Sequence, residues 1–242
     1  MPNAVVSRQE WLEARKALLV KEKELTRARD RLNEARRALP WEPVTRDYVF
    51  DTASGPKSLG ELFGHCSQLL VYHFMLAPDW EEGCVGCSFL ADHLDGAVVH
   101  LKAGDAAFVA VSRAPLEKIE AYKARMGWKF PWVSSNGNDF SYDYQVSFRD
   151  EDVASGTITY NYRDIPAMGE LKDLPGASAF AKGEDGRIYH TYSTYARGAE
   201  QVISTLMLLD FMPKGRNEEG TMNWVRRHDQ YEDAPKASGC CH

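Results

Sequence analysis

The sequence predicts an α/β sandwich built around a mixed β-sheet, preceded by one long helix. Three observations support this class. Apolar runs typical of buried strands alternate with segments of helical periodicity between residues 41 and 135. A hairpin pattern follows at residues 178–195. A last apolar segment with helical spacing covers residues 199–212.

The long N-terminal helix is predicted over residues 7–39. Ser7 and Glu10 form a capping box at its start, and Leu39-Pro40 ends it. One face repeats every seven residues, at Trp11, Leu18, Leu25, Leu32 and Leu39, with Ala14, Lys21, Ala28 and Ala35 three places after the first four. Such a narrow seam suits close packing against another helix. The helix therefore either lies along its own domain or forms the arm of a homodimer.

The central segments follow in alternation. Strand-like runs cover residues 44–50, 68–75, 106–112 and 130–135. Helical segments cover residues 58–63, 87–94 and 114–128. Ser58 and Glu61 give the first of these helices a capping box, and Pro115 opens the last.

Beyond residue 140 the pattern is less regular. Aromatic-rich extended runs at residues 141–176 suggest an excursion over the central domain. Residues 214–242 are polar and are expected to be loosely held. The chain is thus divided into a helix at 1–40, a central domain at 41–213 and a tail at 214–242.

Composition and charge exclude some classes of function. The net charge is -6, with a net +4 in residues 1–40 and a net -10 in the remainder. An acidic body offers no general nucleic-acid footprint, and no apolar run is long enough for a membrane span. No secretory signal is visible, which points to the cytoplasm, where thiols stay reduced. The five cysteines are therefore expected to be reactive, metal-binding or buried rather than a disulfide framework.

Cys84 and Cys87 form a C-x-x-C pair between a strand and a helix. Cys84 is expected near the helix N-terminus, where free N–H groups and the dipole favour a thiolate. Cys87 would lie on the same face, one turn further along. Cys84 is thus predicted as the nucleophile and Cys87 as the resolving thiol. Three acids at residues 79, 81 and 82 would raise the thiol pKa if close, so a basic helper must come from elsewhere in the fold.

Two other interpretations stay open for the pair. Both cysteines are small enough to be ordinary core residues. Alternatively, the two cysteines would supply half of the ligands of a zinc site, which needs two further ligands. Cys240, Cys241 and His242 offer such ligands, or a tail thiol that reaches Cys84. No phosphate-binding glycine loop and no nucleotide or flavin pattern occurs, so no cofactor is predicted.

Several segments resemble known families. Residues 106–135 and 176–198 look like the strand, helix and late hairpin of the peroxiredoxin-like branch of the thioredoxin superfamily. More closely, "EWLEARKALLVKEKELTRARDRL", "LPWEPV", "PDWEEGC", "HTYSTYARG" and "WVRRHDQYE" resemble a bacterial family named domain of unknown function 899. This resemblance implies a thioredoxin-like three-layer sandwich and a dithiol–disulfide oxidoreductase.

The resemblance also suggests helper residues. A thioredoxin carries a cis-proline facing its dithiol, and Pro175 is the candidate here. A late-strand arginine approaches the reactive thiol in the peroxiredoxin-like arrangement, which points to Arg197. His73 is titratable near neutrality and is the candidate general acid or base. The chain departs from thioredoxins in having Gly83 before the pair, and from peroxiredoxins in having Glu81 where a Thr or Ser is usual.

The first functional hypothesis is a cytosolic thiol–disulfide oxidoreductase. Its substrate would be a protein or small-molecule disulfide, and a cellular thiol or a reductase would supply electrons. The second hypothesis is a protein that binds a metal or a thiol ligand through the same pair and the tail cysteines. The third is a non-catalytic redox sensor that forms oligomers, such as a homodimer through residues 7–39. The sequence names no substrate and no potential.

Overall fold

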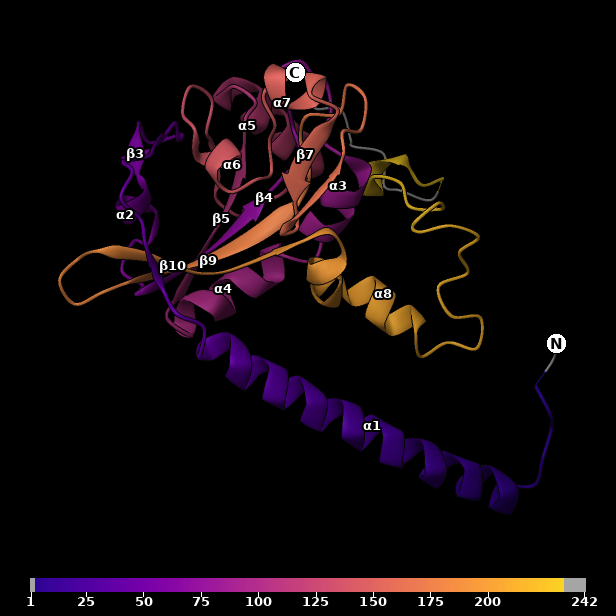
Figure 1. The fold of residues 1–242 in the computed structure, drawn as a ribbon. Helices are drawn as coiled ribbons and strands as arrows, with labels where there is room; N and C mark the ends of the chain where they lie inside the picture. Colours follow the sequence, from indigo (N-terminus) through magenta and orange to yellow (C-terminus); the bar gives the residue numbers. More distant parts are fainter. Residues whose placement is uncertain (1–2, 233–242) are drawn as a thin grey trace, which may run out of the picture. The chain divides into compact units, whose positions relative to one another are not determined.

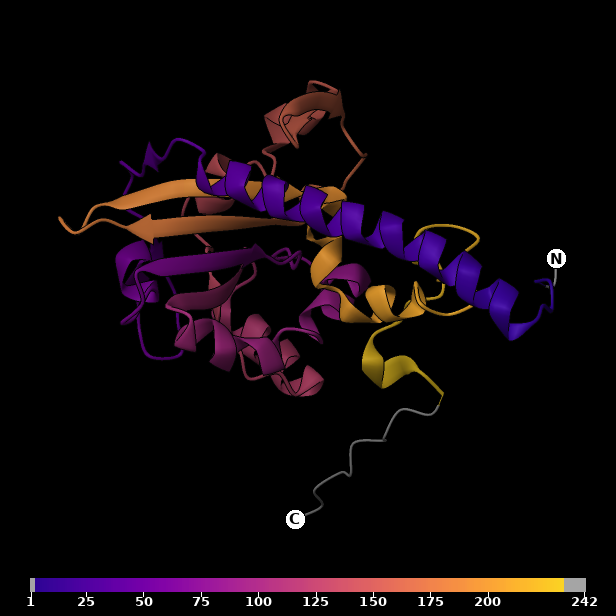
Figure 2. The ribbon, with the colours of Figure 1, turned by 90° about the horizontal axis from the view of Figure 1, so that it is seen from below.

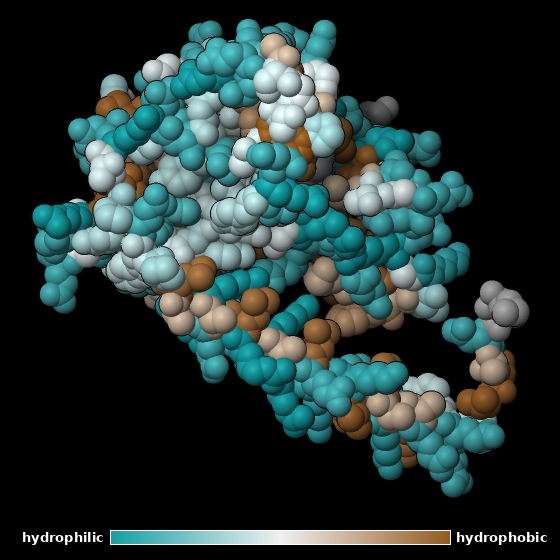
Figure 3. Space-filling view, viewed as in Figure 1, coloured by the Kyte–Doolittle hydropathy of each residue, from teal (hydrophilic) through white to brown (hydrophobic). Residues whose placement is uncertain are grey.

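A computed structural model describes residues 3–232, which divide into two compact units meeting at Trp41 and Glu42. The first unit is helix α1 (Arg8–Arg37) (Figure 1). Its predicted capping box is confirmed: the Ser7 side chain accepts a hydrogen bond from the Glu10 amide, and the Glu10 carboxylate accepts one from the Ser7 amide at 2.9 Å. None of its residues is buried, and apolar side chains appear among polar ones along it in Figure 3.

The second unit is built on a six-stranded mixed sheet with the order β1-β10-β9-β4-β5-β6. The strands are β1 (Glu42–Pro43), β4 (Gln68–His73), β5 (Ala106–Ser112), β6 (Trp132–Ser134), β9 (Gly176–Lys182) and β10 (Ile188–Tyr195). β4, β5 and β6 are parallel, whereas β9 runs antiparallel to both β4 and β10. Val71 marks the register at the centre, opposite Val109 on one side and Ser178 on the other.

Helices connect the parallel strands. α3 (Val85–Ala91) and α4 (Asp95–Ala103) lead from β4 to β5, and α5 (Leu116–Met126) leads from β5 to β6. The β9–β10 hairpin is followed by the 3-10 helix η1 (Ala196–Val202) and by α8 (Ser204–Leu209). A β-α-β unit joined to an antiparallel hairpin in the order β5-β4-β9-β10 is the topology of a thioredoxin-like fold. The predicted fold class is therefore confirmed.

The two faces of the sheet carry separate cores, because successive strand side chains point to opposite faces. Tyr72 on β4 faces α3, α5 and α8, in a cluster that includes Cys87. Val71 faces the other way, toward the small elements on the second face. Those elements are β2 (Val49–Phe50), β3 (Lys57–Ser58), α2 (Leu59–Leu62) and α6 (Phe140–Asp143).

The excursion departs from its prediction. Residues 140–143 form α6 rather than a strand, and they are followed by α7 (Asp150–Ala154) and by the hairpin of β7 (Thr157–Tyr160) and β8 (Arg163–Pro166). This hairpin, drawn in salmon, stands away from the main sheet in Figure 2. Its inner residues form a third small core with Tyr195.

Three further expectations are wrong. The strand predicted at 44–50 is reduced to its last two residues, β2, and α4 was not predicted. The helix predicted at 199–212 is broken between η1 and α8, because Ile203 has φ -87° and ψ 86°. Residues 222–230 are not loose: Val225 is only 3% exposed. None of the helices within residues 3–232 combines the length and apolarity needed to cross a bilayer.

Candidate dithiol site

Cys84 lies where the loop after β4 meets α3, as the N-cap of that helix. Its amide donates to the carbonyl of Met75 at 3.0 Å, and its own carbonyl accepts from the amide and the hydroxyl of Ser88 at 2.9 and 2.8 Å. Gly83 allows this path because a Cβ there would lie 2.7 Å from the rings of Phe74 and Tyr122. The backbone on both sides of the sulfur is therefore fixed.

The half-buried Cys84 sulfur is surrounded by hydrogen-bond donors. It accepts hydrogen bonds from the Cys87 thiol and from the backbone amides of Cys87 and Gly86. These donors, opposed by partial burial and assisted by the charge of Arg227, lower the pKa of Cys84 to about 6. An ordinary thiol titrates near 8.5. A thiolate at neutral pH is the nucleophilic form of cysteine.

Cys87 has the opposite environment. It is only 2% exposed, and burial is the largest cause that raises its pKa well above the usual value. The Tyr72 hydroxyl and the Met75 amide donate to its sulfur, which opposes part of that effect. The site therefore pairs an acidic, reachable thiol with a buried, protonated one.

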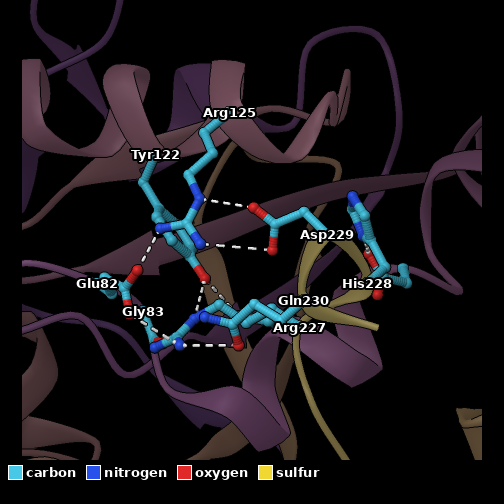
Figure 4. Close-up of polar contacts among 10 residues, drawn as sticks. Glu82, Gly83, Tyr122, Arg125, Arg227, His228, Asp229 and Gln230 are labelled. Carbon is cyan, nitrogen blue, oxygen red and sulfur yellow. Dashed lines mark hydrogen bonds and ion pairs between the residues drawn. The ribbon is translucent and has the colours of Figure 1, made fainter. Parts of the chain in front are cut away.

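Arg227 reaches the site from residues 222–230, hereafter the strap (Figure 4). Its guanidinium donates to the Gly83 carbonyl at 2.7 Å and to the Tyr122 hydroxyl at 2.9 Å. The Tyr122 hydroxyl in turn lies 2.9 Å from the Ser88 hydroxyl, which donates to the Cys84 carbonyl. Arg227 thus contacts the backbone before the nucleophile directly and the backbone of Cys84 through two hydroxyl groups.

Further ion pairs attach the strap to the same loop and helices. Asp229 accepts from Arg125 on α5 at 2.7 Å, and Arg125 also pairs with Glu82. Glu82 additionally lies 2.8 Å from Arg227. These two cations lower the pKa of Glu82 and neutralise the acid that was expected to disfavour the thiolate. At the other end of α3, His228 contacts Asp92 at 2.7 Å.

Comparison with known proteins assigns the family. The model of a family described as "Bacterial protein of unknown function (DUF899)" matches residues 1–231. The chain belongs to this family. Among curated proteins, a sequence search with the DUF899 chain finds no match.

Solved structures give distant similarities to the DUF899 chain. It is similar to Peroxidoxin BcpB from Mycobacterium tuberculosis, at 14% identity and a TM-score of 0.44, over 70% of this chain and 97% of that one. It is also similar to a PrxQ mutant from Xylella fastidiosa, at 15% identity and a TM-score of 0.44, over 69% and 94%. Peroxiredoxin Q from Xanthomonas campestris gives 15% identity and a TM-score of 0.43, over 72% and 98%. The thioredoxin-like fold is established by strand order and register, not by these similarities.

Pro175 and Arg197 lie near the dithiol of the DUF899 chain, with differences from expectation. Pro175 lines the same cavity as Cys84 and Cys87, but no peptide bond within residues 3–232 is cis. Arg197 also lines the cavity, yet its guanidinium binds Glu200 at 2.5 and 3.0 Å and its side chain is 74% exposed. The cation that acts on the Cys84 thiol is Arg227 instead.

His73 is on the wrong face of the sheet to exchange a proton with Cys84. It follows Tyr72 on β4, so it points away from the cysteines and stacks against Tyr144. Its Nε2 bonds to the Ser178 hydroxyl at 2.8 Å, and complete burial lowers its pKa to about 3. His73 is therefore a neutral core residue.

The metal-binding interpretation finds no support in the described part of the DUF899 chain. Within residues 3–232, no group of three or more His, Cys, Asp or Glu side chains is placed to hold a metal ion. Cys240, Cys241 and His242 lie outside the described residues.

Sequence reasoning did not identify Arg227, Tyr72 and Tyr122 as residues that contact the dithiol site. The signal for Arg227 was present in "WVRRHDQYE", one of the segments that resembled the family. Sequence alone does not show which of its two arginines meets the cysteine loop.

Proposed function

We propose that this protein is a dithiol–disulfide oxidoreductase. The Cys84 thiolate attacks a disulfide, and Cys87 then displaces the product from the mixed disulfide. The reaction leaves a Cys84–Cys87 disulfide, which cellular thiols or a reductase reduce again. One observation carries the proposal: the neighbours of the two sulfurs lower the pKa of Cys84 to about 6 and raise that of Cys87.

The division of roles follows from that difference. Attack requires a thiolate that substrate can reach, and Cys84 is the less buried of the two. Resolution requires a second thiol nearby that stays protonated until it is needed. Cys87 already donates to the Cys84 sulfur, so the two are in contact before any substrate arrives.

The test is a redox titration of the pair. Protein equilibrated across a series of glutathione ratios is trapped with an alkylating agent, and its free thiols are counted by mass. A Cys240→Ser, Cys241→Ser sample is run in parallel. The expected result is a reversible two-electron transition confined to Cys84 and Cys87, with turnover lost in Cys84→Ser. Absence of that disulfide at every ratio would refute the proposal.

We also propose that α1 pairs with α1 of a second copy. The seven-residue repeat of Trp11, Leu18, Leu25 and Leu32 suits a two-stranded coiled coil, and no residue of the 30-residue helix is buried within the chain. An isolated helix gains most of its stability from packing an apolar face. A second copy supplies the matching seam.

A further inference from the structure

A cavity of about 380 Å³ adjoins the dithiol. Its walls come from five parts of the second unit: β4, α3, the stretch from Tyr160 to Gly176, η1 with α8, and residues 216–222. Both Cys84 and Cys87 line it. A substrate that reaches the nucleophile through this cavity is therefore enclosed by the protein on several sides.

The lining of the cavity is mainly apolar. Its aliphatic and aromatic side chains include Tyr72, Leu90, Leu174, Ile203, Leu206 and Met222. Small residues at Gly86 and Ala199 keep the space open. At Gly86 a Cβ would lie 3.4 Å from the end of the Met222 side chain, which also lines the cavity.

The two cationic side chains at the cavity are already paired with carboxylates, and Glu218, which also lines it, accepts from the Met222 amide at 3.2 Å. Glu200 accepts from both Arg197 and Arg216. Arg216 also binds Asp210 at 2.8 Å. The cations that line the cavity thus have carboxylate partners, and an anionic ligand would have to displace them. Charge recognition is a poor match for this cavity, whereas burial of apolar surface is a good one.

We infer that the cavity binds a low-molecular-weight disulfide with an uncharged, apolar body, and that Cys84 attacks it there. This inference rests on the proposed function and names its substrate class. The volume is at the lower end of the range for small-molecule pockets. Walls from five chain segments leave space for a small molecule beside the sulfur, but they obstruct a folded protein that presents its own disulfide.

Oxidation of the protein dithiol needs no reactant other than the disulfide substrate. The Cys84 thiolate forms a bond to one sulfur of R–S–S–R, the S–S bond breaks, and one thiolate leaves and takes up a proton. The Cys87 thiol then loses its proton and attacks the Cys84 sulfur. This step breaks the mixed disulfide and releases the second thiol. The protein dithiol is oxidised to a disulfide, and the substrate is reduced to two thiols.

The experiment measures how fast three disulfides oxidise the reduced protein: dipropyl disulfide, glutathione disulfide and insulin. Each rate is divided by the rate of the same disulfide with dithiothreitol, which removes differences in intrinsic reactivity. Dipropyl disulfide is expected to exceed the other two by at least about tenfold, because its methylenes become buried. Equal or lower normalised rates for dipropyl disulfide would overturn the inference.

Ala199→Phe fills part of the cavity and is expected to remove that preference. It should lower the normalised rate of dipropyl disulfide by more than that of glutathione disulfide, when both are divided by the rate of Cys84 alkylation by iodoacetamide in the same variant. Ala97→Phe is the matched control, since Ala97 is also half-buried on a helix but does not line the cavity. If Ala199→Phe fails to fold, Met168→Trp serves instead, because Met168 lines the cavity and is 45% exposed. An unchanged preference in a folded cavity variant would contradict the inference.

The two proposals fail in different ways. If the Cys84–Cys87 disulfide forms reversibly in the glutathione titration but no apolar preference exists, only the substrate class is wrong. If that disulfide never forms with any oxidant, the oxidoreductase itself is wrong, and the substrate class falls with it.

Discussion

Replacing Arg227 by Gln tests whether the strap supports the acidity of the nucleophile. The Arg227 guanidinium is 2.7 Å from the carbonyl oxygen of Gly83, the residue before Cys84, and its charge lowers the pKa of the Cys84 thiol. For two charges roughly 6–7 Å apart and an effective dielectric constant of about 40–80, Coulomb's law gives about 0.6–1.4 kcal/mol, or roughly half to one pKa unit. Since the pKa of Cys84 is about 6, the variant should titrate between about 6.5 and 7.

The assay is the rate of Cys84 alkylation by iodoacetamide as a function of pH, read by mass on the cysteine-containing peptide. Near pH 6 the R227Q rate should fall roughly two- to fivefold, whereas above about pH 8.5 it should match the wild type. Arg227→Lys keeps the charge and should recover most of the shift. A loss of rate at every pH would indicate a blocked thiol rather than an altered pKa.

Arg226→Gln is the matched control for Arg227→Gln. Arg226 adjoins Arg227 in sequence, but its guanidinium donates to the carbonyls of Asn223 and Val225 and its amide donates to the Tyr231 hydroxyl. It therefore makes these contacts within residues 223–231 and not with the cysteine loop. The Arg226→Gln variant removes the same charge and should leave the pKa of Cys84 unchanged. A pKa in R227Q within about 0.2 of the wild type, or an equal shift in R226Q, would refute the reasoning.

Four other predictions follow from the same structure. Cys87→Ala removes the thiol that donates to Cys84, so the pKa of Cys84 should rise in the alkylation profile. The folded state lowers the pKa of Cys84, so its thiolate adds to the free energy of unfolding above about pH 8.5, and this contribution is lost as pH falls through about 6. Urea unfolding with reductant should show the lost stability in the wild type but not in Cys84→Ser. Gly83→Ala places a Cβ 2.7 Å from two buried rings and should lower the free energy of unfolding by roughly 1–3 kcal/mol. Leu18→Lys with Leu25→Lys should convert a dimer to a monomer in light scattering, and a wild type that is monomeric at all concentrations would contradict the coiled coil.

The elements around the dithiol could be predicted because their signals are local. An apolar run at residues 68–75, a turn and a C-x-x-C pair gave β4 and α3, and Pro115 marked the start of α5. The hairpin of β9 and β10 followed from alternation around the turn at 183–186. Each of these elements obeys its own propensity, so local reasoning was sufficient.

The aromatic residues at 140–144 were misread because tertiary packing overrode their strand propensity. Phe140 is fully buried on the second face of the sheet, against Phe50 and Tyr48. Its amide donates to the side chain of Asn138 at 3.0 Å, which favours a turn there. No local pattern encodes a core that forms between these segments.

The helper residues could not be assigned for a similar reason. Residues 66–101 contain no Lys or Arg, so a cation had to come from elsewhere in the chain, but Arg227 is 144 residues from the glycine that it contacts. The family resemblance pointed to Arg197 instead, but the Arg197 guanidinium forms an ion pair with Glu200. Side-chain pairing of this kind depends on which carboxylate is closest in three dimensions.

The position of the strap also orders events during protein synthesis. Translation completes every strand of the sheet, through Tyr195, before the ribosome reaches Arg227. Chains released between residues 196 and 221 would carry every strand and both cysteines but not Arg227, so the pKa of their Cys84 thiol would be higher than in finished chains.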